Sequence, residues 1–340
     1  MIDSNCHVLE NYKICRYSIG IVQVLHKQFL AMWQHISQHI GKTIQEQLTI
    51  LGQKSVAGGC INQNYTLQTN LGNYFVKLNQ AELGEMFVAE AKGLLQMQAT
   101  NTIKVPRPIC YGIVNDRAYL VLEWLALSKN TRQDWSLMGA KLALMHGFPV
   151  ANLQLDQKLD QKLDQRLDQK LNKGFGWVMN NTIGSTPQLN PWTTNWAKFF
   201  AEERIGYQLQ LAQRRGGQFP EVSQVVEAVY QALINHQPQP SLVHGDLWGG
   251  NAGITNDGEP VIFDPASYVG DREVDLAMTK LFGGFPKEFY QGYHQTLPLP
   301  PGYEQRETIY NLYHILNHFN LFGGGYASQA NQMIREILLP

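Results

Sequence analysis

The chain contains the stretch Leu242-Val-His-Gly-Asp-Leu-Trp-Gly-Gly-Asn251, which is followed by Val261-Ile-Phe-Asp264-Pro. The first residues of this stretch are apolar and predict a short strand that leads into a polar loop. Between the two segments, Asn256-Asp-Gly258 predicts a tight turn that joins two further short strands. This hairpin is expected to return Asp264 towards Asn251, so that the two polar side chains lie at the same end of it.

Three side chains of this segment match the needs of phosphoryl transfer. Such a reaction requires a carboxylate that orients the acceptor hydroxyl and hard oxygen ligands for Mg²⁺. Asp246 is placed to accept the hydroxyl proton, while Asn251 and Asp264 offer oxygen ligands. The alternative is a pair of unrelated loop acids beside a turn. The five-residue spacing and the trailing acid occur together, which favours the phosphoryl-transfer interpretation.

Residues upstream supply further parts of a nucleotide site. Val56-Ala-Gly58-Gly59-Cys-Ile-Asn62 lies between two predicted strands, where glycines would let the backbone approach phosphates. Alone, two adjacent glycines indicate only a hairpin. Lys77 lies in the next predicted strand and Glu90 on the helix that follows. A strand lysine held by a helix glutamate can reach the phosphates of a nucleotide. The alternative is an exposed lysine and a solvated helix glutamate.

Short apolar runs separated by glycine and asparagine predict a small sheet in the first part of the chain, and helical periodicity dominates the second. We therefore predict an α+β, two-lobed fold: an N-terminal extension over 1–31, a small antiparallel-sheet-plus-helix N-lobe over 32–124, and a mainly helical C-lobe over 125–340. The expected strands are 48–51, 65–68, 74–78, 109–114 and 118–122, and the expected helices are 87–97, 135–146, 196–214, 222–235, 304–319 and 327–338.

The segment 155–173 repeats the tetrapeptide Leu-Asp-Gln-Lys with small changes. A four-residue period drifts around a helix, so the leucines would form a slanting stripe, and like charges recur at i,i+4. We interpret this segment as a surface insertion of low complexity; a partner-binding helix is the alternative.

Composition limits the partners. The 340 residues include 27 Lys+Arg and 28 Asp+Glu, for a formal net charge of -1. Nucleic-acid binding requires clustered cations, which are absent from the sequence, and no apolar run approaches the about 18 residues of a membrane span. Four cysteines form no Cys-x-x-Cys pair, which fits a reducing, cytoplasmic compartment. The sequence predicts no particular oligomeric state.

These motifs resemble the fructosamine kinase (ketosamine 3-kinase) family, which is similar to aminoglycoside and choline phosphotransferases within the protein-kinase-like fold. The resemblance covers about 32–338. Its motifs are His244-Gly-Asp-Leu-Trp-Gly-Gly-Asn251-Ala-Gly, Phe263-Asp-Pro-Ala, Gly270-Asp-Arg-Glu-Val-Asp-Leu-Ala277, Tyr310-Asn-Leu-Tyr-His-Ile-Leu-Asn-His318 with Leu321-Phe-Gly323, Gly184-Ser-Thr-Pro-Gln188 and Phe199-Phe-Ala-Glu-Glu-Arg204.

The resemblance implies Mg²⁺-dependent transfer of the γ-phosphate of ATP to the sugar 3-hydroxyl of a ketoamine, free or on protein amines. The phosphorylated adduct then sheds its sugar, which makes the activity deglycation. Asp246 is implied as the proton acceptor. The other implied roles are Mg²⁺ ligation by Asn251 and Asp264, phosphate binding by Lys77 and Glu90 with the glycine loop at Gly58, Gly59 and Asn62, and adenine binding by the hinge Glu123-Trp124-Leu125.

Four further residues are assigned supporting or alternative roles. Trp248 either packs against the sugar or is a core aromatic. His244 is expected to orient the loop, and Asp275, near a helix start, to brace it. Cys60 is either a redox switch or a small buried side chain. Two rival functions stay open: phosphorylation of another hydroxylated amine, such as an aminoglycoside or choline-like compound, and a nucleotide-binding pseudokinase that serves as an interaction module.

Overall fold

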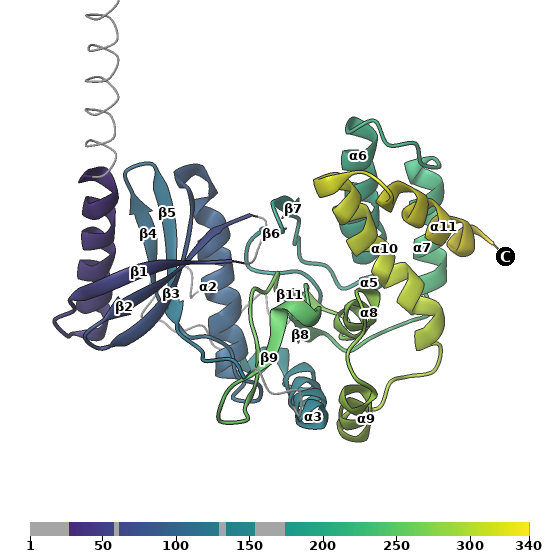
Figure 1. The fold of residues 1–340 in the computed structure, drawn as a ribbon. Helices are drawn as coiled ribbons and strands as arrows, with labels where there is room; N and C mark the ends of the chain where they lie inside the picture. Colours follow the sequence, from purple (N-terminus) through teal and green to yellow (C-terminus); the bar gives the residue numbers. More distant parts are fainter. Residues whose placement is uncertain (1–26, 58–60, 129–133, 154–173, 340) are drawn as a thin grey trace, which may run out of the picture. The chain divides into compact units, whose positions relative to one another are not determined.

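The computed structural model describes residues 27–57, 61–128, 134–153 and 174–339, and these form two compact units (Figure 1). The first unit consists of the described residues up to Gly84 together with Ile109–Glu123. The second unit consists of Glu85–Pro108 and the described residues from Trp124 onwards. The expected α+β class is thereby confirmed. The repeat at 155–173 lies outside the described residues.

The first unit is built on a five-stranded sheet with the spatial order β1-β2-β3-β5-β4. The neighbours β1, β2, β3 and β5 pair antiparallel. A turn at 70–72 joins β2 to β3, as the Asn-Leu-Gly sequence predicted. The strands are β1 (Ile50–Val56), β2 (Gln63–Thr69), β3 (Gly72–Gln80), β4 (Pro108–Val114) and β5 (Arg117–Glu123).

A helix over 27–44 covers this sheet, purple in Figure 1. Its buried side chains Met32, Trp33, Ile36 and Ile40 recur at helical spacing and face sheet residues such as Val76. We placed 27–31 in the N-terminal extension, whereas the described helix already includes these residues.

The strand expected at 48–51 was wrong in position, because β1 runs over Ile50–Val56. β1 lies at the edge of the sheet and carries mostly exposed or half-buried residues, including Gln53, Lys54 and Ser55. An edge strand of this kind lacks the apolar alternation on which strand prediction depends.

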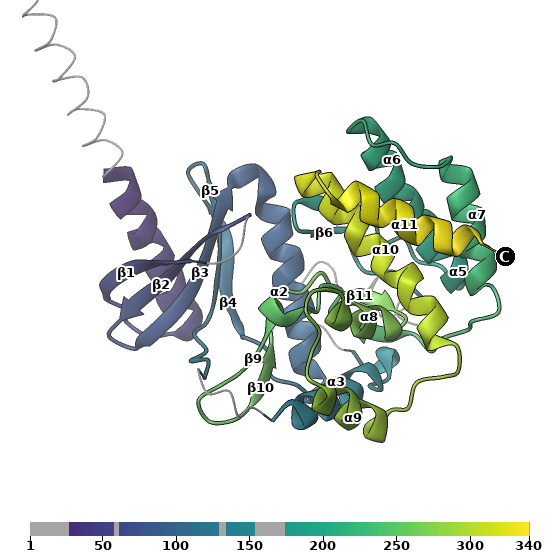
Figure 2. The same cartoon turned by 45° about the vertical axis from the view of Figure 1, so that its right-hand side comes forward.

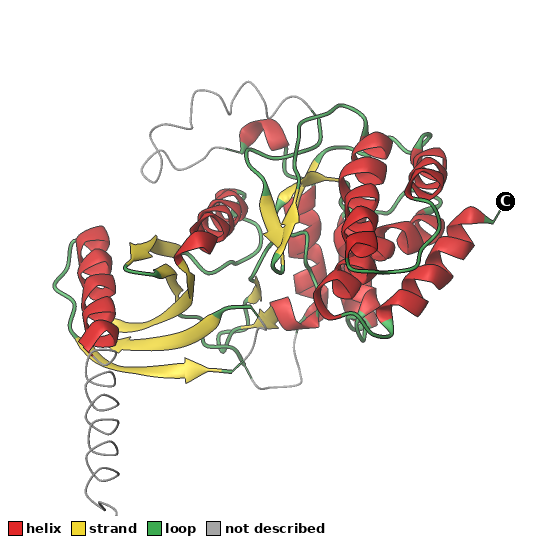
Figure 3. Cartoon of the chain, turned by 90° about the horizontal axis from the view of Figure 1, so that it is seen from above, coloured by secondary structure: helices red, strands yellow, loops and turns green. Residues whose placement is uncertain are grey.

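The second unit is mainly helical and contains three short antiparallel pairs, β6 with β7, β9 with β10 and β8 with β11 (Figure 3). The strands are β6 (Asn181–Ile183), β7 (Thr186–Gln188), β8 (Ser241–Val243), β9 (Ala252–Ile254), β10 (Pro260–Ile262) and β11 (Tyr268–Gly270). The helical segments are α2 (Gly84–Ala99), α3 (Trp135–His146), α5 (Trp196–Phe199), η3 (Phe200–Gly206), α6 (Tyr207–Arg214), α7 (Val222–Leu233), α8 (Glu273–Leu281), α9 (Lys287–Thr296), α10 (Tyr303–Phe322) and α11 (Tyr326–Leu338), with one-turn helices at Val150–Asn152 and Gly249–Asn251.

Sequence periodicity located most of these helices and missed α9. The segment Lys287–Thr296 is polar apart from a few aromatic residues, so its pattern did not distinguish it from a loop. Among the described residues, none of the helices combines the length and the apolar character that crossing a membrane requires.

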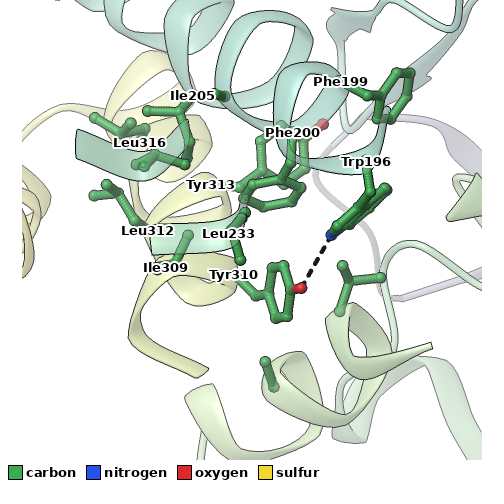
Figure 4. Close-up of a cluster of buried hydrophobic side chains, with 14 of the residues drawn as sticks. Trp196, Phe199, Phe200, Ile205, Leu233, Ile309, Tyr310, Leu312, Tyr313 and Leu316 are labelled. Atoms are coloured by element: carbon green, nitrogen blue, oxygen red, sulfur yellow. Dashed lines mark hydrogen bonds between the residues drawn. The ribbon is translucent and has the colours of Figure 1, made fainter. Parts of the chain in front are cut away.

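An aromatic core fixes the helices of the second unit (Figure 4). Trp196 and Phe200 pack against Tyr310 of α10, with ring centroids 6.2 and 5.0 Å from the Tyr310 ring. The indole nitrogen of Trp196 donates a hydrogen bond to the Tyr310 hydroxyl at 3.0 Å. Buried aromatic side chains contribute large apolar areas and need partners for their polar atoms, and both conditions are met here.

One buried histidine of α10 should make the protein sensitive to acid. Burial, and next the charge of His318, lower the pKa of His314 from 6.5 to about 3. The unfolded chain therefore binds a proton that the folded chain does not, so stability is full above pH 6.5 and falls as the pH drops towards 3.

We expect His314→Gln to reduce the slope of the unfolding free energy against pH by about 1.4 kcal/mol per pH unit in that window. Urea unfolding between pH 7 and pH 4 measures it, with the exposed His294→Gln as control. An unchanged slope in the His314 variant would contradict the assignment.

Candidate active site

The strand β8 leads into the loop His244–Asn251, and the hairpin β9–β10 follows it directly (Figure 2). The backbone N–H of Phe263 donates to the carbonyl of Asn251 at 3.0 Å and closes the base of the hairpin. Asp264 is thereby returned to the end of the loop that holds Asn251, as the sequence predicted. Asn251, Phe263 and Asp264 all belong to the second unit.

Asn251 is bound to Asp246. Its side-chain nitrogen donates to the Asp246 carbonyl at 2.9 Å and to the Asp246 carboxylate oxygen Oδ2 at 3.2 Å. Because both contacts use the amide nitrogen, the amide oxygen is the atom of this side chain that suits a cation. The five-residue spacing in the sequence thus corresponds to a one-turn helix, Gly249–Asn251, that turns Asn251 back onto Asp246.

A second carboxylate acts on Asp246. Burial raises the pKa of Asp246 well above its usual range, the charge of Asp264 raises it further, and the hydrogen bond from Asn251 partly opposes both. A half-buried carboxylate whose ionisation is opposed by a neighbouring acid forms a site that a cation would stabilise. Carboxylate and amide oxygens are also the ligands that Mg²⁺ prefers. The residues present therefore fit a Mg²⁺ ion.

Histidine 244 orients the loop through both ring nitrogens. Its Nδ1 accepts from the Asp246 backbone N–H at 3.3 Å, and its Nε2 donates to the Phe263 carbonyl at 2.9 Å. This pattern requires the neutral tautomer that carries its proton on Nε2. Complete burial lowers the pKa of His244, although nearby Asp275 opposes the change. These contacts agree with the orienting role expected from the sequence.

Asp275 of α8 supports the backbone of the same loop. Its two carboxylate oxygens accept the backbone N–H groups of His244 at 2.6 Å and Gly245 at 2.8 Å. His146, at the end of α3, contacts Oδ2 through Nε2 at 3.1 Å. Burial alone would raise the pKa of Asp275, but the hydrogen bond and charge of His146 bring it below its usual value. The bracing role expected for Asp275 thus has a structural basis.

His146 is a residue that sequence reasoning missed. Its other ring nitrogen, Nδ1, lies 2.8 Å from the Tyr293 hydroxyl, and Tyr293 accepts a hydrogen bond from Arg272 at 3.1 Å. The only signal in the sequence was a histidine at the end of a predicted helix, which is equally typical of a residue that interacts with the helix dipole.

Trp248 lies at the surface of the loop with 40% of its area exposed. Its indole ring covers Gly250 closely: a Cβ at Gly250 would lie 2.3 Å from the ring. The alternative of a core-packing tryptophan is therefore wrong. Trp248 is instead an exposed aromatic side chain on the loop, two residues from Asp246 in the sequence.

The remaining predicted residues are divided between the units. Gly58, Gly59 and Cys60 lie outside the described residues. Asn62 accepts a hydrogen bond from Asn79 at 2.7 Å in the first unit. Lys77, which is buried, and Glu123, at the end of a strand, also belong to the first unit. Glu90, which is buried, belongs to the second unit, as do the half-buried Trp124 and Leu125. The phosphate clamp and the adenine hinge stay predictions.

The fold has known counterparts among phosphotransferases. A thermostable mutant of an aminoglycoside phosphotransferase, solved with AMP-PNP and hygromycin B, matches with a TM-score of 0.51 at 15% identity, over 85% of this chain and 94% of that one. This likeness concerns the fold alone. Together with the His244–Asn251 loop, it defines the chain as a protein with the protein-kinase-like fold of small-molecule phosphotransferases.

Closer comparisons identify the family. The fructosamine kinase family model matches residues 32–339, so the chain belongs to the fructosamine kinase family. A Synechocystis protein named as a probable ketoamine kinase is 54% identical over 308 residues, which cover 91% of this chain and 97% of that one. A Haemophilus somnus structure described as a fructosamine-3-kinase has a TM-score of 0.80 at 32% identity, covering 92% of this chain and 99% of that one.

Gly245 shows how tightly the loop is packed. Its φ of +80° is in the left-handed region, and a Cβ there would lie 2.2 Å from the carbonyl oxygen of Ala266. Gly258, at the hairpin turn, has a φ of +88° but nothing within 4 Å of such a Cβ. Comparing the two glycines therefore separates the free-energy cost of a left-handed backbone from the cost of the contact with Ala266.

We expect Gly258→Ala to cost about 1–2 kcal/mol of unfolding free energy, from the left-handed conformation alone. Gly245→Ala should cost more than about 4 kcal/mol, because backbone must also move. Denaturant unfolding of both variants measures the difference. Equal losses would show that the Ala266 contact contributes nothing.

Proposed function

We propose that this chain transfers the γ-phosphate of ATP to the 3-hydroxyl of a ketoamine sugar. The observation that carries the proposal is the half-buried Asp246 carboxylate, held by Asn251 and accompanied by Asp264. Membership of the fructosamine kinase family and the names of the Synechocystis and Haemophilus relatives support this substrate class.

Asp246 is proposed as the proton acceptor. The new bond forms between the sugar 3-hydroxyl oxygen and the γ-phosphorus, the bond from that phosphorus to the β-bridging oxygen breaks, and the hydroxyl proton passes to the Asp246 carboxylate. Burial and the neighbouring acid make this carboxylate a better base than an exposed aspartate. The hydrogen bond from Asn251 limits the rotation of its side chain.

Asn251 and Asp264 are proposed to hold Mg²⁺ through oxygen atoms. The bound ion would neutralise phosphate charge, which is the main requirement of phosphoryl transfer. The family resemblance adds Lys77 with Glu90 as the phosphate clamp, Gly58, Gly59 and Asn62 as the glycine loop, and Glu123-Trp124-Leu125 as the adenine hinge.

Trp248 is proposed to bind the sugar. Its exposed indole face lies on the loop that carries Asp246, and aromatic faces pack against the apolar face of a sugar ring. Loss of the sugar from the phosphorylated product would make the reaction a deglycation. We place this activity in the cytoplasm, in keeping with the absence of Cys-x-x-Cys pairs from the sequence.

Replacing Asp246 by Asn should lower turnover by about 10²–10⁴-fold, because the side chain keeps its shape but no longer accepts the proton. Nucleotide binding should survive. Steady-state kinetics and calorimetry with AMP-PNP measure the two properties. Asp257→Asn, which replaces an exposed acid at the turn of the β9–β10 hairpin, is the matched control. Near-wild-type turnover in Asp246→Asn would remove Asp246 from the mechanism.

Phosphorus NMR identifies the acceptor. After incubation with Mg²⁺-ATP, a new phosphate ester is expected with fructosyl-lysine or ribulosyl-lysine and none with kanamycin or choline. An ester on kanamycin or choline alone would transfer the assignment to another hydroxylated amine. Nucleotide binding without transfer to any acceptor would support a pseudokinase instead.

A further inference from the structure

The hairpin β6–β7 has no part in the proposed chemistry, yet its buried amides are aimed at the active site. The side-chain nitrogen of Gln188 donates to the carbonyl of Ala266 at 2.9 Å. That of Asn181 donates to the next carbonyl, Ser267, at 2.8 Å. These two carbonyls lie two and three residues after Asp264. The hairpin is thus hydrogen-bonded to the backbone segment that follows Asp264, the proposed Mg²⁺ ligand.

Both amides are themselves locked in place. Gln188 also donates to the Asn181 side-chain oxygen at 2.8 Å, and its own oxygen accepts the Tyr313 hydroxyl at 2.6 Å. Asn190 donates to the same Asn181 oxygen at 2.8 Å. Every polar atom of the Gln188 amide therefore has a partner, which fixes the direction in which its nitrogen points.

A buried arginine anchors this group. Arg204 donates to the Asn190 side-chain oxygen at 2.7 Å and to the Leu189 carbonyl. Its guanidinium lies 4.5 and 4.3 Å from the centroids of Phe199 and Tyr268. Arg204 belongs to η3, a π-helical segment, and such segments are frequent at functional sites.

The backbone at Asp264 needs such support. Asp264 has a φ of 59°, in the left-handed region, although it is not glycine and precedes Pro265. Proline disfavours compact conformations of the residue before it, and strain of this kind costs about 1–3 kcal/mol and persists only where the surroundings impose it. On the other side, Ala266 donates to the His244 carbonyl at 2.9 Å. The strained residue is followed by a segment held from two directions.

We propose that Gln188 and Asn181 are positioning residues, which hold the Ala266 and Ser267 carbonyls so that Asp264 keeps the conformation that binds Mg²⁺. The proposal rests on the proposed function, in which Asp264 is a Mg²⁺ ligand. It gives a role to the motifs Gly184–Gln188 and Phe199–Arg204. The first supplies Gln188, which holds the Ala266 carbonyl, and the second supplies Arg204, which holds Asn190.

Gln188→Met tests this proposal, because methionine keeps the volume and removes the hydrogen bonds. Gln208→Met is the matched control: Gln208 is equally buried and shares Tyr313 with Gln188, but its other amide partners are Asn317 and Asn320 of α10, not Ala266 or Ser267. Electron paramagnetic resonance of Mn²⁺ with AMP-PNP measures metal affinity without turnover. Gln188→Met should weaken Mn²⁺ binding about 10–100-fold, the usual effect of losing a residue that supports a ligand, while the control keeps wild-type affinity.

Hydrogen exchange over 263–268 supplies a second measurement, and should accelerate in Gln188→Met and not in Gln208→Met. If Gln188→Met does not fold, Asn181→Ala replaces it with the same expectation. Wild-type Mn²⁺ affinity in a folded Gln188 or Asn181 variant would overturn the proposal. Asp264→Asn is measured in parallel: if that variant binds Mn²⁺ normally, the metal assignment fails, which separates failure of the proposed function from failure of the positioning role.

Discussion

The rest of the site depends on the hydrogen bonds that the Asp275 carboxylate accepts from the backbone of the loop. A loop that leaves a carboxylate partly accessible, as this one does for Asp246, needs its backbone held by a more rigid element. Asp275 accepts two successive backbone N–H groups of that loop and lies on a buried helix. His146 in turn restrains Asp275 from a different helix. Removing one partner of such a buried network leaves the others unsatisfied, which is costly.

The segment from His244 to Ser267 is thus held at three points, and at two of them, Asp275 and the β6–β7 amides, the holding groups have no chemical part in the proposed reaction. Asp275 holds the start of the loop, Asn251 turns its end back onto Asp246, and the β6–β7 amides hold the chain beyond Asp264. Phosphoryl transfer depends mainly on placing charges correctly and asks little covalent chemistry of the protein. A catalyst of this kind therefore needs many residues that only hold the charged groups in position.

Sequence reasoning located the loop and the return of Asp264, because spacing along a short hairpin determines both. It also found the sheet and most helices, because their apolar periodicity is local. It missed His146 and gave no role to Gln188 or Arg204, because their partners lie in other elements and their residue types occur in any helix or turn. It left both alternatives for Trp248 open, because no pattern in the sequence distinguishes an exposed aromatic side chain from a buried one. Local patterns identify reacting groups more readily than the groups that support them.

The supporting contacts join distant parts of the chain. His146 and Asp275 are 129 residues apart, and Gln188 and Ala266 are 78 apart. Closing loops of this length costs conformational entropy that helices formed from nearby residues avoid. The helices of the second unit can therefore form early, whereas the left-handed conformation at Asp264 can persist only after both long loops have closed. A folding chain would acquire its secondary structure first and the proposed metal site last.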